Sequence, residues 1–232
     1  MTKEKEPTDF FTKEHAERYD ERNKNLSPIS DNLHFLIRLI LKDLPPKAKI
    51  LSVGAGTGAE IIALAKHFPK WSFVAVEPSL SMLEVCKERV RAAGFMQRFE
   101  FFHGYAKDFV DGENFDAALA VLVGHFVVRE ERVSFYKSLV SRLKTGGYFI
   151  NAEISYDLDS PEFPEMLKGW EQVQRLMGAT SESLAGLPKQ LREVLTVLPP
   201  DEVRSLIRDA DIELPIRFFQ ALMISGWCGV KG

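Results

Sequence analysis

Three glycines and one acidic residue have the types and the spacing that a ligand-binding site would need. Gly54, Gly56 and Gly58 interrupt the stretch KILSVGAGTGAEIIALAKHFP at residues 49–69, between an apolar run and a helical pattern. A glycine turn between a strand and a helix allows a ligand to lie directly against the main chain. Glu77 ends the next apolar run, and a carboxylate there can accept both ribose hydroxyls of a nucleoside. The combination predicts a nucleoside-cofactor site; the alternatives are a turn that merely needs glycine and a solvated acid at a strand end.

The same glycines also satisfy the dinucleotide fingerprint, so NAD has to be weighed. The pattern reads Gly54-x-Gly56-x-x-Ala59, as in dinucleotide-binding turns. Glu60 falls in the first turn of the expected helix, where it would repel a pyrophosphate but not a cation that lacks phosphate. The first expected strand also begins only at residue 49, whereas dinucleotide domains often open near the N-terminus. Both observations favour a cofactor without phosphate.

Metal and disulfide chemistry have little support in the sequence. The five histidines show no HxH or HExxH spacing, so we expect no metal site. Cys86 and Cys228 are far apart and form neither a disulfide framework nor a metal-binding pattern. His103 lies within a β-rich run and reads as structural.

Alternating strands and helices would position the candidate residues. The pattern predicts βαβ units and a doubly wound, mostly parallel sheet. The expected strands are 49–53, 72–77, 99–104, 115–122 and 147–154, and the expected helices between them are 58–67, 81–94 and 129–144.

The alternation of strands and helices does not continue on either side of this region. About two helices precede it, one of them the amphipathic run at 33–44, and residues 158–198 are helical in pattern. A further helix is expected at 199–212, and two β-like runs broken near Ser225-Gly226 close the chain. We therefore expect a seven-stranded Rossmann-like α/β sheet with an antiparallel C-terminal hairpin. Its parts would be an N-terminal helical lid (1–47), a cofactor-binding core (48–157 and 199–232) and a helical insertion after strand five (158–198) that serves as an acceptor cap or a dimer contact.

Charge and hydropathy exclude several classes of partner. The chain of 232 residues has 30 Lys and Arg against 33 Asp and Glu, a net charge of −3, which is no electrostatic footprint for nucleic acid or an anionic membrane. The run at 33–44 is too short to span a bilayer, and the charged first residues contain no apolar segment of the secretory type. We expect a cytoplasmic protein with no membrane partner and no direct nucleic-acid partner.

Several motifs in order resemble those of the class I S-adenosylmethionine-dependent methyltransferases. They are VGAGTG, VEPS, HGYAKDF, FDAALAVLVGHFV and LKTGGYFINAEI, which together cover residues 48–154. A looser match covers residues 199–230, and FFQALMISGWCGVK (218–231) fits the family's final antiparallel hairpin. The resemblance implies S-adenosylmethionine as cofactor, S-adenosylhomocysteine as product and methyl transfer as the reaction.

The resemblance also implies which residues touch the cofactor. The glycine turn would face the methionine half, Glu77 the ribose, and the residues after the second and third strands the adenine. Tyr105 stands where many members carry an acid, so it would stack on the adenine or hydrogen-bond to it, unless it is a simple loop aromatic. The implied contact residues are Tyr19, Arg22, Gly54, Ala55, Gly56, Thr57, Glu77, Pro78, Ser79, Met82, Gly104, Tyr105, Ala106, Val121 and Leu122.

Methyl transfer needs alignment and exclusion of water more than covalent chemistry from the protein. By resemblance, His125 at the exit of strand four is a candidate general base, with packing at a helix start as its alternative. In the lid, Tyr19 would shield the sulfonium by a cation–π contact and Arg22 would meet the methionine carboxylate. Both residues also fit an ordinary amphipathic helix.

Within the family, the insertion and RFFQALMISGWCGVK at residues 217–231 are similar to the carboxy-S-adenosylmethionine synthase branch of the tRNA wobble-uridine pathway. Arg175 would then hold the added carboxylate of a modified cofactor, with a helix-surface arginine as the alternative. The primary expectation is a methyltransferase acting on a small molecule, because [DN]PP[YF] is absent after strand four and the charge is balanced. The other expectations are a carboxy-S-adenosylmethionine synthase-like enzyme and a regulatory module that binds the cofactor without turnover. The hydrophobic insertion also leaves room for a homodimer without requiring one.

Overall fold

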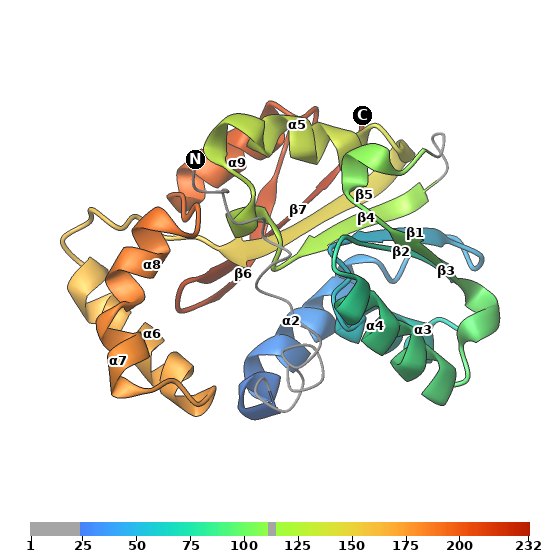
Figure 1. The fold of residues 1–232 in the computed structure, drawn as a ribbon. Coiled ribbons are helices and arrows are strands. Elements are labelled where there is room, and N and C mark those ends of the chain that lie inside the picture. Colours follow the sequence, from blue (N-terminus) through green and yellow to red (C-terminus); the bar gives the residue numbers. More distant parts are fainter. Residues whose placement is uncertain (1–23, 111–114) are drawn as a thin grey trace, which may run out of the picture.

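A single seven-stranded sheet runs through the computed structural model, which describes residues 24–110 and 115–232 (Figure 1). The strand order is β3-β2-β1-β4-β5-β7-β6. The first five strands pair in parallel, and β7 pairs antiparallel with both β5 and β6. The strands are β1 (Lys49–Val53), β2 (Ser72–Glu77), β3 (Phe99–His103), β4 (Phe115–Val121), β5 (Leu143–Ile154), β6 (Ile216–Ala221) and β7 (Ile224–Val230). The predicted doubly wound sheet with an antiparallel hairpin is therefore confirmed.

The central strands are buried on both faces because helices cover both sides of the sheet. Successive side chains of β1 show this: Ile50 belongs to the apolar cluster on one face and Leu51 to the cluster on the other. Helices α2, α3 and α4 lie on the first face, and α5 and α9 on the second (Figure 1). Their bounds are α2 (Ser27–Ile40), α3 (Ala59–His67), α4 (Leu80–Ala92), α5 (Arg129–Val140) and α9 (Pro200–Arg208).

The helical character expected after β5 is present as three helices at one end of the sheet (Figure 1). They are α6 (Phe163–Leu176), α7 (Ser181–Ala185) and α8 (Leu187–Glu193). Trp170 and Leu191 are buried in the same apolar cluster as α2 and α3. The start of the described chain contacts this region, because Asn25 Nδ2 donates to the Leu176 carbonyl over 3.0 Å. The N-terminal segment and the insertion therefore meet on the face that carries α2.

Several element boundaries differ from those the sequence predicts. The helix expected to reach residue 144 ends at Val140, since Leu143 already pairs with Phe115 on β4. The chain then bends at Gly146, and the ladder resumes with Tyr148 opposite Ala117.

Two further helices have other limits than expected. Helix α2 begins at Ser27, with Pro28 in its first turn, six residues before the apolar periodicity becomes clear. Helix α9 ends at Arg208, and Asp211 then takes a left-handed conformation with φ of 69°. Local turn geometry determines where α2 begins and where α9 ends, and the spacing of hydrophobic residues does not predict that geometry.

Among residues 24–110 and 115–232, no helix has both the length and the apolar character that crossing a membrane requires.

Candidate cofactor site

The glycine turn after β1 lies between the ends of two neighbouring strands. The N–H groups of Gly54 and Ala55 donate to the Val76 carbonyl of β2, over 2.8 and 3.2 Å. Gly54 has φ of 65°, and a Cβ at this position would lie 2.4 Å from Cγ2 of Val123, just beyond β4. Only glycine combines this conformation with this approach. The turn is thus fixed at the carboxyl edge of the sheet, where open α/β sheets bind ligands.

Glu77 closes the other end of the turn. Its Oε2 accepts from the Gly56 N–H and its Oε1 from the Ser79 N–H, both over 2.9 Å. The side chain is only 6% exposed, and burial raises its pKa while these two N–H groups lower it. A carboxylate offers about four acceptor positions, so two hydroxyl groups can still be accepted. The acid is held where one ligand could contact it and the glycine turn together.

The residues after β2 and β3 form the neighbouring rim. Ser79 caps α4, with its Oγ accepting from the Met82 N–H over 3.4 Å, and Pro78 lies between it and Glu77. The Met82 methyl group lies 3.6 Å from the position that a Cβ of Gly56 would occupy. Pro78, Ser79 and Met82 thus lie beside Glu77 and the glycine turn, and their contact with the adenine remains a prediction.

After β3, the chain returns to the same edge, because the Gly104 N–H donates to the Glu77 carbonyl over 3.1 Å. Tyr105 is an exposed aromatic residue of this rim, and Lys107 Nζ lies 5.7 Å from its ring centre. The Ala106 carbonyl accepts from Arg142 Nη2 over 3.1 Å, which ties the loop to the end of α5.

The exit of β4 is half-buried and has a strained backbone. Leu122 has φ of 59°, an uncommon value for a residue with a side chain, and its N–H donates to the Ala152 carbonyl on β5. Strain of this kind persists where the surroundings enforce it, which is often at functional sites. Val121 and Leu122 are half-buried at this exit, and their contact with the cofactor remains a prediction.

His125 lies in the short 3₁₀ turn Gly124–Phe126 and is 4% exposed. Its Nδ1 faces the Ile154 N–H at 3.3 Å and accepts that hydrogen, so the proton of the neutral ring is on Nε2. Burial, assisted by the nearby Arg132 charge, lowers its pKa to about 3. The ring is therefore neutral at physiological pH. This arrangement suits donation of a hydrogen bond from Nε2 better than removal of a proton.

Sequence reasoning did not find a buried charged network beneath this turn. Arg132 Nη1 contacts Glu153 Oε1 at 2.5 Å, and both side chains are inaccessible to solvent. Tyr136 donates to Glu153 Oε2 over 2.7 Å, and Asn151 Nδ2 donates to the same oxygen over 3.1 Å. The only signal in the sequence is the pair of polar residues Asn151 and Glu153, two positions apart in the apolar second half of β5. Their partners on α5 are apparent only in three dimensions.

The remaining predicted residues lie outside the described chain, lie apart from this edge, or lie in the glycine turn with their side chains bound elsewhere. Tyr19 and Arg22 fall within residues 1–23, which the structure does not describe. Arg175 is exposed on α6, next to Leu176, which accepts the bond from Asn25. Thr57 is buried, and its Oγ1 accepts from Arg89 Nη1 over 2.7 Å, so its side chain braces α4.

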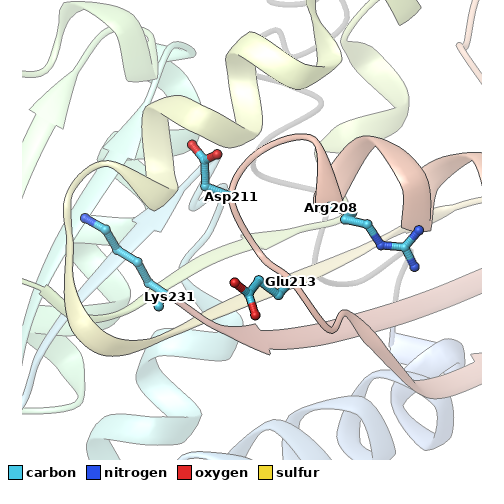
Figure 2. Close-up of a pocket in the computed structure, with 5 residues that line it drawn as sticks. Arg208, Asp211, Glu213 and Lys231 are labelled. Carbon is cyan, nitrogen blue, oxygen red and sulfur yellow. The ribbon is translucent and has the colours of Figure 1, made fainter.

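A charged pocket of about 590 Å³ lies at the opposite edge of the sheet. Figure 2 shows Asp211 and Glu213 between Arg208 and Lys231, which line it. Lys231 follows β7, whose Val230 pairs with Tyr148 near the start of β5, whereas the glycine turn follows the end of β1. This pocket contains none of the predicted site residues. In the part of the chain that the structure describes, no three His, Cys, Asp or Glu side chains are grouped so as to hold a metal ion.

Comparisons with known proteins show which proteins this chain resembles. Residues 50–147 match a methyltransferase domain. The chain is 26% identical over 179 residues to a carboxy-S-adenosyl-L-methionine synthase of Campylobacter hominis, covering 76% of this chain and 74% of that protein.

Solved structures share the fold. An O-methyltransferase of Nostoc punctiforme superposes with a TM-score of 0.67 at 20% identity, over 89% of this chain and 58% of that one. Human N-acetylserotonin methyltransferase, solved with S-adenosylmethionine, superposes with a TM-score of 0.56 at 15% identity, over 82% of this chain and 49% of that one. The chain thus spans about half the length of these structural neighbours.

The matched domain over residues 50–147 and the shared fold support a class I S-adenosylmethionine-dependent methyltransferase. The same matches support S-adenosylmethionine as the cofactor over the dinucleotide alternative.

Proposed function

We propose that this protein transfers the methyl group of S-adenosylmethionine to a small-molecule acceptor. The observation that carries the proposal is the buried Glu77 carboxylate, bound to the Gly56 N–H at the carboxyl edge of the sheet. If Glu77 binds the ribose, the rest of the cofactor would lie along the glycine turn and extend toward Val123 and the exit of β4.

The reaction asks for alignment of the acceptor atom, the methyl group and the sulfur. His125 at the β4 exit could orient an acceptor through its Nε2 hydrogen, either directly or through a water molecule, or could remove a proton as the sequence suggests. The lid and the insertion would close the pocket above this point and select the acceptor. The balanced charge supports a small molecule over a nucleic acid.

Replacement of Glu77 by alanine tests the site directly. We expect Glu77→Ala to weaken S-adenosylmethionine binding by about 1–3 kcal/mol, because charged hydrogen bonds to the ribose are lost. Glu84→Ala is the matched control, since Glu84 lies on the neighbouring α4 and only pairs with Lys87 on the surface. Calorimetric affinities that are equal in wild type and Glu77→Ala would remove Glu77 from the site.

A second function is favoured by the curated relatives, which carry the name carboxy-S-adenosyl-L-methionine synthase. In this case the protein would modify the cofactor, and Arg175 would bind the added carboxylate. Because Arg175 is exposed on α6, this role requires α6 to close over the glycine turn.

Mass spectrometry of the nucleoside that co-purifies with the protein separates the two functions. The methyltransferase predicts S-adenosylmethionine or S-adenosylhomocysteine, and the second function predicts the carboxylated nucleoside. Loss of the carboxylated species in Arg175→Ala, but not in Lys168→Ala on the same helix, would establish the second function.

A cytoplasmic location and a homodimer belong to the same proposal. Leu176 and Val194 are exposed apolar side chains on the insertion, and they would support a dimer contact there. Size-exclusion chromatography with light scattering measures the mass that decides the oligomeric state.

A further inference from the structure

The chain enters and leaves the helical insertion beside the turn that carries His125. The Thr196 N–H, on the segment that leaves the insertion, donates to the His125 carbonyl over 2.8 Å. Two positions further on, the Leu198 carbonyl accepts from Ser155 Oγ, just after β5, over 2.8 Å. We call residues 195–198 the returning arm. This arm is therefore bound both to the exit of β4 and to the chain that leaves β5.

One buried side chain, Arg132, reaches both the returning arm and this turn. Its Nη2 donates to the Thr196 carbonyl over 3.0 Å and to the Val127 carbonyl over 2.9 Å. Its Nη1 pairs with Glu153, and both side chains are inaccessible to solvent. Arginine suits this place because its planar guanidinium spreads five N–H donors over three nitrogens, whereas the three donors of lysine share one nitrogen.

A buried ion pair is a costly way to stabilise a fold. Each charge loses its hydration, and a well-packed apolar pair of similar volume often gives equal or higher stability. An apolar pair, however, cannot bind carbonyl groups on two separate segments. Glu153 also excludes side chains from the turn, because a Cβ on Gly124 would overlap its Oε2. The pair therefore fixes geometry more than it adds stability.

We propose that Arg132 is a positioning residue for the acceptor side of the site. Paired with Glu153, it holds the returning arm and the turn of His125 in one relative position, so that the insertion and the exit of β4 present a single shape to the acceptor. The assignment rests on the proposed function, because it takes the exit of β4 as the place of methyl transfer. Fully buried, Arg132 acts through Thr196 and His125 rather than by contact with a reacting atom.

Two variants separate position from stability. The double variant R132M/E153M removes both buried charges and their desolvation, but it also removes the donors to the Val127 and Thr196 carbonyls. Arg132→Lys retains a cation beside Glu153 and loses the reach to the Thr196 carbonyl. We expect both proteins to fold, and we expect both to release the returning arm from the turn.

Nitrogen NMR of protein with labelled histidines measures the position of the His125 ring, with His125→Asn to assign its signals. In wild type at neutral pH, the ring should show one tautomer, with its proton on Nε2 and Nδ1 accepting from the Ile154 N–H. In both variants, we expect the two tautomers to exchange, because the turn no longer keeps Nδ1 against that N–H. Arg129→Lys is the matched control, since Arg129 is on the same helix and forms its ion pair at the surface.

Hydrogen exchange measures the attachment of the returning arm. The Thr196 amide should exchange about tenfold faster or more in both variants than in wild type, because hydrogen bonds to a charged donor are lost beside it. Amides of β1 and β2 are the reference for any change in global stability. The calorimetric affinity for S-adenosylhomocysteine should stay at the wild-type value, since the glycine turn and Glu77 belong to these two strands and their ends.

Three results would overturn the proposal. One is a wild-type His125 ring with its proton on Nδ1, a result that needs no variant to fold. Another is an R132M/E153M protein that keeps one tautomer and the wild-type exchange of Thr196, because the pair would then be a replaceable part of the core. The third is exchange that rises equally in Thr196, β1 and β2, which would show a loss of stability alone. Failure of S-adenosylhomocysteine to bind wild type would instead contradict the proposed function, and the two measurements on the turn distinguish that failure from this one.

Discussion

Gly124 is the residue at which the cofactor edge meets the buried charge network. A Cβ at this position would lie 1.7 Å from Glu153 Oε2 and 3.2 Å from Arg132 Nη1. Neither neighbour is the free end of a flexible surface side chain, because both are fully buried in one ion pair. The close approach of Gly124 therefore fixes how His125, the next residue, is presented at the site.

Replacement of Gly124 by alanine should destabilise the protein by about 3 kcal/mol, through overpacking and displacement of the buried carboxylate. Gly186→Ala is the matched control, since Gly186 has φ of −82° and the nearest atom to its added Cβ is 3.6 Å away. We expect that control to be neutral or slightly stabilising. Urea unfolding midpoints of the two variants provide the measurement, and equal midpoints would contradict the account of Gly124.

The sequence predicted some residues of the site and missed others for a physical reason. Gly54, Gly56 and Glu77 could be found because each lies at a strand end, and strand ends are visible as breaks in hydrophobic runs. Glu60 was noticed only as a charge that would repel pyrophosphate, because its bond to Ser52 depends on how α3 packs under β1. Local patterns report where the chain turns, but they do not report which side chains the packing brings together.

At the scale of elements, Arg132 joins four parts of the fold. Its guanidinium contacts Glu153 on β5, donates to the Val127 carbonyl after the 3₁₀ turn, and donates through Nη2 to the Thr196 carbonyl over 3.0 Å. The Thr196 N–H in turn donates to the His125 carbonyl over 2.8 Å. The chain leaving the insertion is thus attached to the same turn that carries His125. A movement of the insertion would be transmitted to the β4 exit by these bonds.

We expect Arg132→Met to cost about 3–5 kcal/mol of stability, because it leaves Glu153 buried without its partner. The double variant Arg132→Met with Glu153→Met should recover much of this loss, since both desolvated charges are removed. Arg129→Met on the same helix is the control: Arg129 pairs with Glu202 on the surface, and its loss should cost less than about 1 kcal/mol. A double-mutant cycle in urea measures the coupling, and purely additive losses would contradict a coupled pair.

The types of the elements could be predicted, whereas some of their ends could not. Strands β1 and β2 have the predicted limits because apolar runs define them on both sides. Helix α5 and strand β5 were misplaced by a few residues, because pairing of Leu143 with Phe115 starts the strand before the glycines. Such ends depend on a strand partner far away in the sequence.

At the scale of the whole molecule, two buried titratable groups make opposite contributions to stability. The pKa of His125 falls from 6.5 to about 3 on burial, so the unfolded chain binds the extra proton between these values. This contribution lowers stability as the pH falls below 6.5. The pKa of Glu60 rises from 4.5 to about 7, so the folded chain binds the extra proton and stability decreases as the pH rises from 4.5 to 7. Between pH 4.5 and pH 6.5 the two contributions cancel.

In single variants, the free energy of unfolding should therefore change with pH in opposite directions, a dependence that cancels in wild type. Glu60→Gln leaves the histidine contribution alone, and its stability should rise by about 2–3 kcal/mol from pH 4.5 to pH 6.5 relative to the double variant with His125→Asn. His125→Asn leaves the carboxylate contribution alone, and its stability should fall by about the same amount over this range. Asparagine suits the position because its Oδ1 can accept from the Ile154 N–H as Nδ1 does. Glu77 and His34, whose pKa values burial also shifts, are present in all these variants, so their effects cancel in the differences. Urea midpoints at pH 4.5, 5.5 and 6.5 measure how the stability of each variant changes with pH. Parallel curves for the two single variants would contradict the opposite pKa shifts of His125 and Glu60 on folding.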